Sequence, residues 1–83
     1  MTKKVQAYIL IEIEIGRTDE VVSQLKAIEE ATRVAVTTGV YDVVVLVEVD
    51  DLEALYDITV HRIHSIPGIM TTSTAVVEKM IST

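Results

Sequence analysis

Apolar and polar positions alternate along the first part of the chain with the period of a β-strand. From Val5 to Ile15 every odd position carries an aliphatic residue, and alternation of this length predicts a strand. The even positions are not uniformly polar, because Tyr8 and Leu10 form an apolar spot in the middle of the second face. Gly16 is expected to end the strand.

After this strand the apolar residues recur with the period of a helix. The Thr-Asp-Glu sequence at 18–20 has the form of a helix start, with a short polar cap and acidic residues in the first turn. A helix is predicted over residues 19–30, followed by a second strand over 33–37 with Val34 and Val36 on its inner face. The apolar positions of the helix are Val21, Val22, Leu25 and Ile28.

A third strand is predicted over residues 43–49, where valine occupies every odd position. Its even positions include Val44 and Leu46. An antiparallel sheet with one face in water would carry polar residues there. Both faces of this strand are therefore expected to be covered.

A second helix is predicted to begin in the acidic sequence at 50–53. An acidic cap followed three positions later by Glu53 has the form of a capping box. Pro67 and Gly68 are expected to stop the helix, and a fourth strand is predicted over 69–80. The apolar stripe of this helix is expected to contain Leu52, Leu55, Thr59, Ile63 and Ile66, with Asp57, His61 and His64 away from it.

The element order is therefore β-α-β-β-α-β. With right-handed crossovers this order predicts an α+β, ferredoxin-like fold, in which a four-stranded antiparallel sheet carries both helices on one face. The first and third strands form the central pair in this topology. Their second faces carry Tyr8, Leu10, Val44 and Leu46, so we expect the open face to be a subunit interface in a dimeric α+β barrel.

Composition also favours oligomerisation of a single small domain. The chain has 83 residues, 49% of them apolar, and no cysteine. Folding at this size removes only roughly 60% of the unfolded surface from water. A domain this small with no disulfide is commonly stabilised by association.

The charge balance excludes some partners. The net charge is −6, and nucleic-acid binding requires clustered lysine and arginine, so no direct nucleic-acid partner is expected. No apolar run approaches the ~20 residues that span a bilayer, and the N-terminus lacks a cleavable signal pattern. We therefore expect a cytoplasmic protein with no membrane partner.

Residues that would support catalysis or metal binding are sparse. The chain has no cysteine and no serine in a Gly-x-Ser-x-Gly context, and its isolated glycines cannot form a phosphate loop. His61 and His64 have a spacing that could hold a metal ion from one helix face, but no third ligand is evident. Two solvated histidines are the simpler interpretation. No metal or other cofactor is predicted.

Gly39 and Asp42 lie where the second strand turns into the third. A site for a free amino acid needs an anionic acceptor for the ammonium group, beside backbone N–H or hydroxyl donors for the carboxylate. Asp42 is a candidate acceptor, and the backbone around Gly39 and Tyr41, with nearby threonine hydroxyls, supplies candidate donors. On local sequence alone the simpler alternative is favoured, in which Gly39 only forms a hairpin turn and Asp42 only begins a strand.

Three stretches of the chain match, in order and spacing, the motifs of a known regulatory family. They are Ala7-Tyr8-Ile9-Leu10-Ile11, Thr38-Gly39-Val40-Tyr41-Asp42 for the family's T-G-x-Y-D, and Pro67-Gly68-Ile69-Met70-Thr71-Thr72-Ser73-Thr74 for its G-V-x-x-T-x-T. On these motifs nearly the whole chain resembles the RAM domain, the ligand-sensing half of the Lrp/AsnC (feast/famine) regulators.

The resemblance implies an amino-acid sensor. Such domains dimerise sheet against sheet, assemble into octamers or decamers, and bind an amino acid or related metabolite at the junction between dimers. Carried over by motif position, Gly39 would admit the ligand to backbone N–H groups, Asp42 would bind its ammonium group and Tyr41 would wall the pocket. The threonines expected to donate to the ligand carboxylate are Thr38, Thr72 and Thr74.

The resemblance also raises an expectation about domain organisation. Full-length family members place a DNA-binding domain before this module, and nothing of that kind precedes Val5. The chain is therefore expected to be a stand-alone RAM domain over residues 1–83. We expect it to co-assemble with full-length regulators and alter their DNA binding.

Two rival functions stay open. A small enzyme of the dimeric α+β-barrel kind, such as a monooxygenase or isomerase, would need a histidine or aspartate in a pocket between helix and sheet, whereas the predicted inward faces are aliphatic. A structural adaptor would keep the assembly surfaces with an empty site. The preferred prediction is a non-enzymatic sensor.

Overall fold

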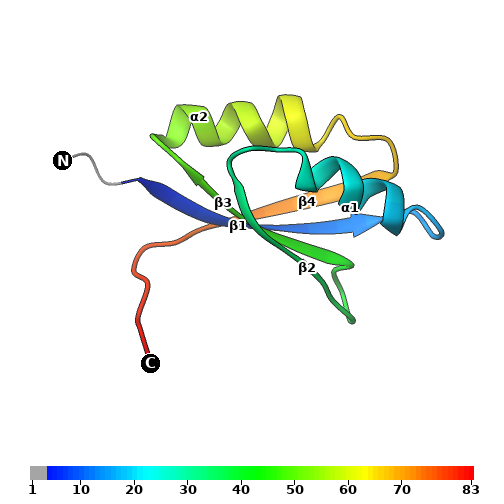
Figure 1. The fold of residues 1–83 in the computed structure, drawn as a ribbon, viewed down its shortest axis with the longest axis horizontal. Coiled ribbons are helices and arrows are strands. Elements are labelled where there is room, and N and C mark those ends of the chain that lie inside the picture. Colours follow the sequence, from blue (N-terminus) through cyan, green and yellow to red (C-terminus); the bar gives the residue numbers. More distant parts are fainter. Residues whose placement is uncertain (1–3) are drawn as a thin grey trace.

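The computed structural model describes residues 4–83 and has the predicted ferredoxin-like architecture. Both helical segments lie on one side of a four-stranded antiparallel sheet, whose strand order is β2-β3-β1-β4 (Figure 1). The strands are β1 (Val5–Ile13), β2 (Ala31–Val36), β3 (Val43–Val49) and β4 (Ile69–Val76), and the helices are α1 (Thr18–Lys26) and α2 (Leu52–Asp57), which continues into η1 (Ile58–Ile63). The predicted central pair, β1 and β3, is confirmed.

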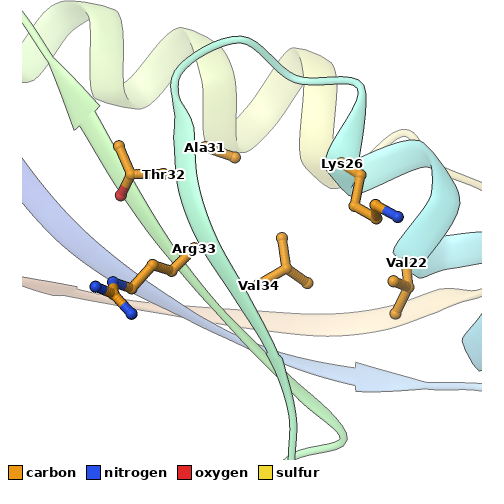
Figure 2. Close-up of a pocket in the computed structure, with 6 residues that line it drawn as sticks. All are labelled: Val22, Lys26, Ala31, Thr32, Arg33 and Val34. Carbon is orange, nitrogen blue, oxygen red and sulfur yellow. The ribbon is translucent and has the colours of Figure 1, made fainter.

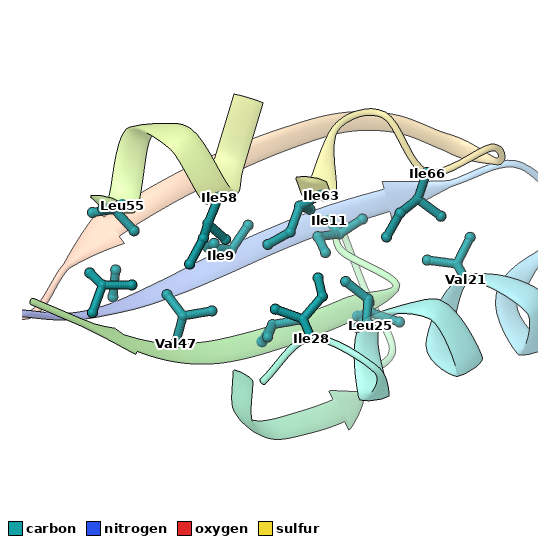
Figure 3. Packing of buried hydrophobic residues seen from close by; sticks show 14 of the residues in the cluster. Ile9, Ile11, Val21, Leu25, Ile28, Val47, Leu55, Ile58, Ile63 and Ile66 are labelled. Carbon is teal, nitrogen blue, oxygen red and sulfur yellow. The ribbon is translucent and has the colours of Figure 1, made fainter. Parts of the chain in front are cut away.

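The core lies between the sheet and the helices (Figure 3). Alternate positions of β1 and β3 face it, because their register pairs Ala7 with Val47 and Ile11 with Val43. No polar or charged residue is buried among residues 4–83. The buried set is Ala7, Ile9, Ile11, Ile13, Val21, Leu25, Ile28, Val43, Val45, Val47, Val49, Leu55, Ile58, Ile63 and Ile66.

Strand β1 ends two residues earlier than predicted, and Ile15 is fully exposed rather than on the inner face. The β1–β3 pairing ends at Ile11 and Val43, and the Glu14 N–H donates to the Gly68 carbonyl at 2.8 Å, next to the start of β4. The backbone then turns at Gly16, where φ is +84°.

Helix α1 is shorter than predicted, because it ends at Lys26 rather than at residue 30. The last amides make tighter bonds three residues back, from Ala27 N–H to the Gln24 carbonyl and from Ile28 N–H to the Leu25 carbonyl. Ile28 stays buried after the helix has ended. The cap position belongs to Arg17, whose side chain does not cap the helix, so the predicted polar cap is wrong, whereas the predicted acidic residues of the first turn, Asp19 and Glu20, are confirmed.

Strand β2 begins at Ala31 and ends at Val36, close to the predicted bounds of 33–37. Val34 packs against the core, but Val36 is 66% exposed. Val36 pairs with buried Val43 and so shares the predicted face. The exposure follows because β2 is an edge strand whose end projects beyond the helices.

Helix α2 begins with a side-chain cap in the predicted acidic sequence, but the cap is Asp51, three positions before Ala54, so the predicted capping box with Glu53 is wrong. The Ala54 N–H donates to Asp51 Oδ1 at 2.8 Å. The predicted apolar stripe is wrong at two positions: Leu52 is 62% exposed, and the buried Ile58 was not included. Leu52 is the first residue of the helix and lies beyond the sheet surface that Leu55 covers.

The second half of this helix is a π-helix. The His64 N–H donates to the Thr59 carbonyl, five residues back, at 2.9 Å. The wider turn lets Ile58 and Ile63, five positions apart, both point into the core. Arg62 is thereby kept at the surface, where it donates to Glu30 Oε1 at 2.9 Å.

Strand β4 ends at Val76 rather than at residue 80. One further bond, from Val77 N–H to the Gln6 carbonyl at 2.8 Å, ends its contact with β1. Residues 78–83 then run away from the helices (Figure 1).

The second face of the sheet is uncovered by any element of residues 4–83. Its centre is apolar, because the register places Tyr8 opposite Leu46 and Leu10 opposite Val44. Tyr8 is 37% exposed and the other three are partly buried. Association through this face stays a prediction.

The π-helical register can be tested by truncating one residue on the buried side of η1 and one on its exposed side. Ile63→Ala should lower the free energy of unfolding by about 2–5 kcal/mol, because it opens a cavity under η1. The control Val60→Ala, at a position 40% exposed, should cost less than about 1 kcal/mol. Urea denaturation measures both, and equal losses would contradict the register.

Candidate functional site

The turn between β2 and β3 has the predicted hairpin form. The Thr37 N–H donates to the Asp42 carbonyl at 2.9 Å, and Thr37 Oγ1 donates to the Tyr41 carbonyl at 2.8 Å. Gly39 has φ +112°, a left-handed conformation that L side chains rarely adopt. Two hydrogen bonds at the base of the loop therefore hold the segment that contains the predicted motif.

Asp42 joins this turn to the neighbouring central strand. Its N–H donates to the Ile11 carbonyl at 2.9 Å, and its Oδ2 accepts a hydrogen bond from the Ile13 N–H at 2.8 Å. The carboxylate thus continues the β1–β3 ladder beyond Val43 and satisfies an amide that the strand leaves unpaired. This structural role corresponds to the simpler of the two sequence interpretations, and local sequence had not identified Ile13 as the partner.

The same turn presents groups without internal partners. Within residues 4–83 the N–H groups of residues 38–41 donate no hydrogen bond, and Asp42 Oδ1 accepts none. No heavy atom lies within 4 Å of the place where a Cβ on Gly39 would be. Thr38 is exposed, whereas Tyr41 and Asp42 are partly buried. The turn can therefore offer amide donors and one carboxylate oxygen to a ligand.

The two predicted threonines of β4 lie apart from the turn. Thr72 pairs with Ile11 and Thr74 with Ile9, so both side chains are on the helix-bearing face of the sheet. Strand β1 separates β4 from β3. Two strand spacings, about 10 Å, therefore lie between Thr72 and Val43 across β1. One chain does not bring the threonines and the turn into direct contact.

The hollows on the molecular surface lie elsewhere. One of about 450 Å³ lies between α1 and β2 and is lined by Val22, Lys26, Ala31, Thr32, Arg33 and Val34 (Figure 2). A second, of about 400 Å³, lies on α2. Neither contains a residue of the predicted ligand site, and the sequence pattern gave no signal for either.

The histidines show no site chemistry of their own. His61 and His64 are both exposed, and the His61 ring meets the Tyr56 ring edge-on with centroids 6.4 Å apart. No group of three His, Cys, Asp or Glu side chains is placed to hold a metal ion within residues 4–83.

Far from the turn, Lys4 Nζ donates to Asp50 Oδ1 at 2.9 Å, and this hydrogen bond, with the Asp50 charge, raises the pKa of Lys4. In the described part of the chain no helix is long and apolar enough to cross a bilayer.

Comparison with known proteins finds relatives along nearly the whole chain. A family model described as the Lrp/AsnC ligand binding domain matches residues 6–82. The HTH-type transcriptional regulator FL11 of Pyrococcus abyssi is 41% identical over 73 residues, which cover 88% of this chain and 48% of the regulator. The chain thus spans about half the length of the curated relatives it matches.

Solved structures share the fold. The crystal structure of FFRP-DM1 superposes with a TM-score of 0.85 at 36% identity, covering 88% of this chain and 97% of that one. The transcriptional regulator NMB0573 of Neisseria meningitidis was solved as a complex with L-methionine. It superposes with a TM-score of 0.88 at 18% identity, and the match covers 95% of this chain and 53% of the regulator. At that identity the second likeness shows the fold alone.

The structural role of Asp42 can be separated from a ligand-binding role by two substitutions. Asp42→Ala should lower the free energy of unfolding by about 1–3 kcal/mol, because the Ile13 N–H loses its acceptor. Asp42→Asn keeps an acceptor oxygen and should cost less than about 1 kcal/mol. Urea denaturation gives both values, and hydrogen exchange of the Ile13 amide should accelerate only in Asp42→Ala. Asp57→Ala, at an exposed carboxylate, is the control, and unchanged Ile13 exchange in Asp42→Ala would contradict the assignment.

Proposed function

Because the chain belongs to the Lrp/AsnC ligand binding domain family, we propose that it is a non-enzymatic sensor that binds a free amino acid or related small metabolite at the Gly39 turn. The module is related to transcriptional regulators. The observation that carries the proposal is the set of unpartnered groups at the turn: consecutive backbone N–H groups beside one carboxylate oxygen of Asp42.

These groups match the two charged ends of an amino acid. Its carboxylate accepts hydrogen bonds from the N–H groups of residues 38–41, which donate to no other group within residues 4–83. Its ammonium group donates to Asp42 Oδ1, while Oδ2 keeps the Ile13 N–H bond. Gly39 allows close approach because no side chain stands over its backbone. Tyr41 walls the pocket.

A second subunit completes the site in this proposal. Thr72 and Thr74 lie across β1 from the turn of their own chain. In the proposed assembly their hydroxyls donate to a ligand at the turn of another copy. The ligand therefore lies at a junction between subunits of a homo-oligomer, an octamer or a decamer of sheet-to-sheet dimers. The apolar centre of the open sheet face, at Tyr8, Leu10, Val44 and Leu46, supports the dimer.

The chemical class of the ligand has support from a fold relative. The regulator NMB0573, which shares this fold at low identity, was solved with L-methionine bound. The fold is thus compatible with amino-acid binding, and side chains from neighbouring subunits select which amino acid binds here.

The relatives support a proposal for the physiological role. The regulator FL11 is about twice as long as the segment that it shares with this chain. FFRP-DM1, by contrast, is covered over 97% of its chain by this module. The proposed sensor acts in the cytoplasm, where it joins full-length regulators through its assembly surfaces and alters their DNA binding. Ligand shifts the assembly only by its different affinity for the assembled and free states.

A thermal-shift screen against the twenty amino acids tests the site. A ligand at about 100 times its dissociation constant should add about 2.7 kcal/mol of stability. The stabilisation should disappear in Asp42→Asn, which keeps the fold but loses the charge that binds the ammonium group. Asp57→Asn should respond like the parent protein. If no amino acid stabilises the protein, or if Asp42→Asn responds fully, the proposed site is wrong.

A further inference from the structure

One side of the second helix carries apolar side chains that residues 4–83 leave exposed. Leu52 and Tyr56 in α2 are 62% and 64% exposed, and Val60 in η1 is 40% exposed. Residues four positions apart lie on the same side of a helix, here a side that flanks the buried Leu55. In Figure 1 no element of the described chain lies on the side of α2 away from the sheet. A stripe of this kind is available to a partner.

Acidic side chains border this stripe. A hollow of about 400 Å³ on α2 is lined by Asp51, Glu53 and Asp57 beside Ala54 and Tyr56, with no basic residue. Asp51 caps the helix, since its Oδ1 accepts the Ala54 N–H. Glu53 and Asp57 are exposed and belong to none of the ion pairs formed within residues 4–83. We call Leu52, Glu53, Tyr56, Asp57 and Val60 the α2 surface.

The π-helical turn supports the aromatic side chain of this surface. The His61 ring meets the Tyr56 ring edge-on with centroids 6.4 Å apart, although the two residues are five positions apart. A π-helical turn brings residues at this spacing together, whereas an α-helix aligns residues three or four apart. The contact restricts the exposed Tyr56 ring, so the ring loses less conformational freedom when a partner covers it.

A second acidic hollow lacks the combination of acidic and apolar groups. It lies beside the start of β1 and the end of β3, where Lys4 pairs with Asp50 and Arg62 pairs with Glu30. Its lining contains no apolar side chain: Lys4, Glu29, Glu30, Thr32, Glu48 and Asp50. Unpaired carboxylates and exposed apolar side chains therefore coincide at the α2 surface and not at this hollow.

A second copy of this chain does not offer a complementary surface within residues 4–83. Lys26 belongs to α1 on the helical side, whereas the register places Arg33 opposite Leu46 on the open sheet face. Figure 2 shows the Arg33 side chain pointing away from Lys26. The other basic residues of the folded body are engaged in ion pairs: Lys4, Arg17 and Arg62. Copies that each carry a net charge of −6 also repel one another.

We propose that the α2 surface docks a basic, amphipathic segment of a different protein. Tyr56, with Leu52 and Val60, packs against apolar side chains of that segment, and the carboxylates of Glu53 and Asp57 accept hydrogen bonds from its lysine or arginine residues. Charge complementarity selects this chemistry, because an acidic surface repels the phosphates of nucleic acids and of anionic membranes.

The apolar stripe and the carboxylates have different parts in this docking. Exposed ion pairs contribute little affinity each, so the carboxylates orient the partner, and burial of Tyr56 supplies most of the binding free energy. The docking uses neither the Gly39 turn nor the open sheet face. It therefore goes beyond the proposed ligand binding and does not rest on it.

A synthetic amphipathic helical peptide of leucine and lysine is the probe for this surface. Titrated into the full chain, it should shift the backbone NMR resonances of residues 51–61 and leave those of the Gly39 turn unchanged. Polylysine has the charge without the apolar side and should bind at least about tenfold more weakly. Absence of binding, shifts confined to another surface, or equally tight binding of polylysine would overturn the proposal.

Substitutions separate the two contributions in calorimetric titrations with the same peptide. Tyr56→Ala should weaken binding by about tenfold or more, because a buried aromatic anchor carries much of the affinity. Glu53→Gln with Asp57→Asn should weaken it by about fivefold, and this loss should shrink at high salt. Glu29→Gln with Glu78→Gln makes the same net charge change at exposed residues outside the α2 surface and should bind like the parent protein.

Further variants keep the test independent of folding. Circular dichroism verifies each fold, and Leu52→Ala, expected to weaken binding by about fivefold, replaces Tyr56→Ala if that variant misfolds. Ile15→Ala, at a fully exposed apolar residue after β1, should bind like the parent protein. Losses in these controls equal to those at the α2 surface would overturn the docking site.

The amino-acid screen, run on the same variants, distinguishes this proposal from the ligand site. Loss of peptide binding with an intact amino-acid response would be specific to the α2 surface and supports the docking. A parent protein that responds to an amino acid but does not bind the peptide would reject the docking alone. Peptide binding without any amino-acid response would support the docking and reject the ligand site alone.

Discussion

The antiparallel register between β1 and β3 is the constraint on which the rest of the structure depends. It pairs Val5 with Val49 and continues without interruption to Ile11 and Val43. A slip of one residue would carry every buried valine of β3 to the open face. The same register brings Asp42 beside Ile13, where the carboxylate accepts the amide N–H. The core and the candidate site therefore depend on one pairing.

Sequence periodicity predicted the ends of an element well where residues close in sequence determine those ends. The third strand has its predicted bounds of 43–49, because a strong alternation lies between a turn and a helix cap. The end of β1 was predicted wrongly, because bonds from Glu14 to Gly68 and from Ile13 to Asp42 join residues far apart in sequence. The stripe of the second helix failed for a related reason, since a periodic pattern does not reveal a π-helical turn that admits Ile58.

Only the part of the candidate site that depends on residues close in sequence could be predicted from local pattern. Gly39 and its turn follow from a break between two strands, and the structure has both. Asp42 was identified as a carboxylate near the turn, but its bond to Ile13 depends on tertiary pairing. Thr72 and Thr74 came from the motif alone. Their position across β1 from the turn shows why no pattern within one chain could join the two groups.

In the proposed sensor, Asp42 connects ligand binding to assembly through the central strands. Covering the apolar centre of the open face contributes roughly 1–2 kcal/mol per side chain, which is substantial against a net stability of about 5–15 kcal/mol for a small domain. Tyr8 and Leu10 on β1, and Val44 and Leu46 on β3, form that centre, and the Asp42 carboxylate bonds to the end of the same β1. A ligand on the free oxygen of this carboxylate thus acts at the end of the strand pair that forms the open face. Its proposed effect on assembly needs no distant relay, because the strands that hold the proposed site also carry the surface through which we expect the copies to associate.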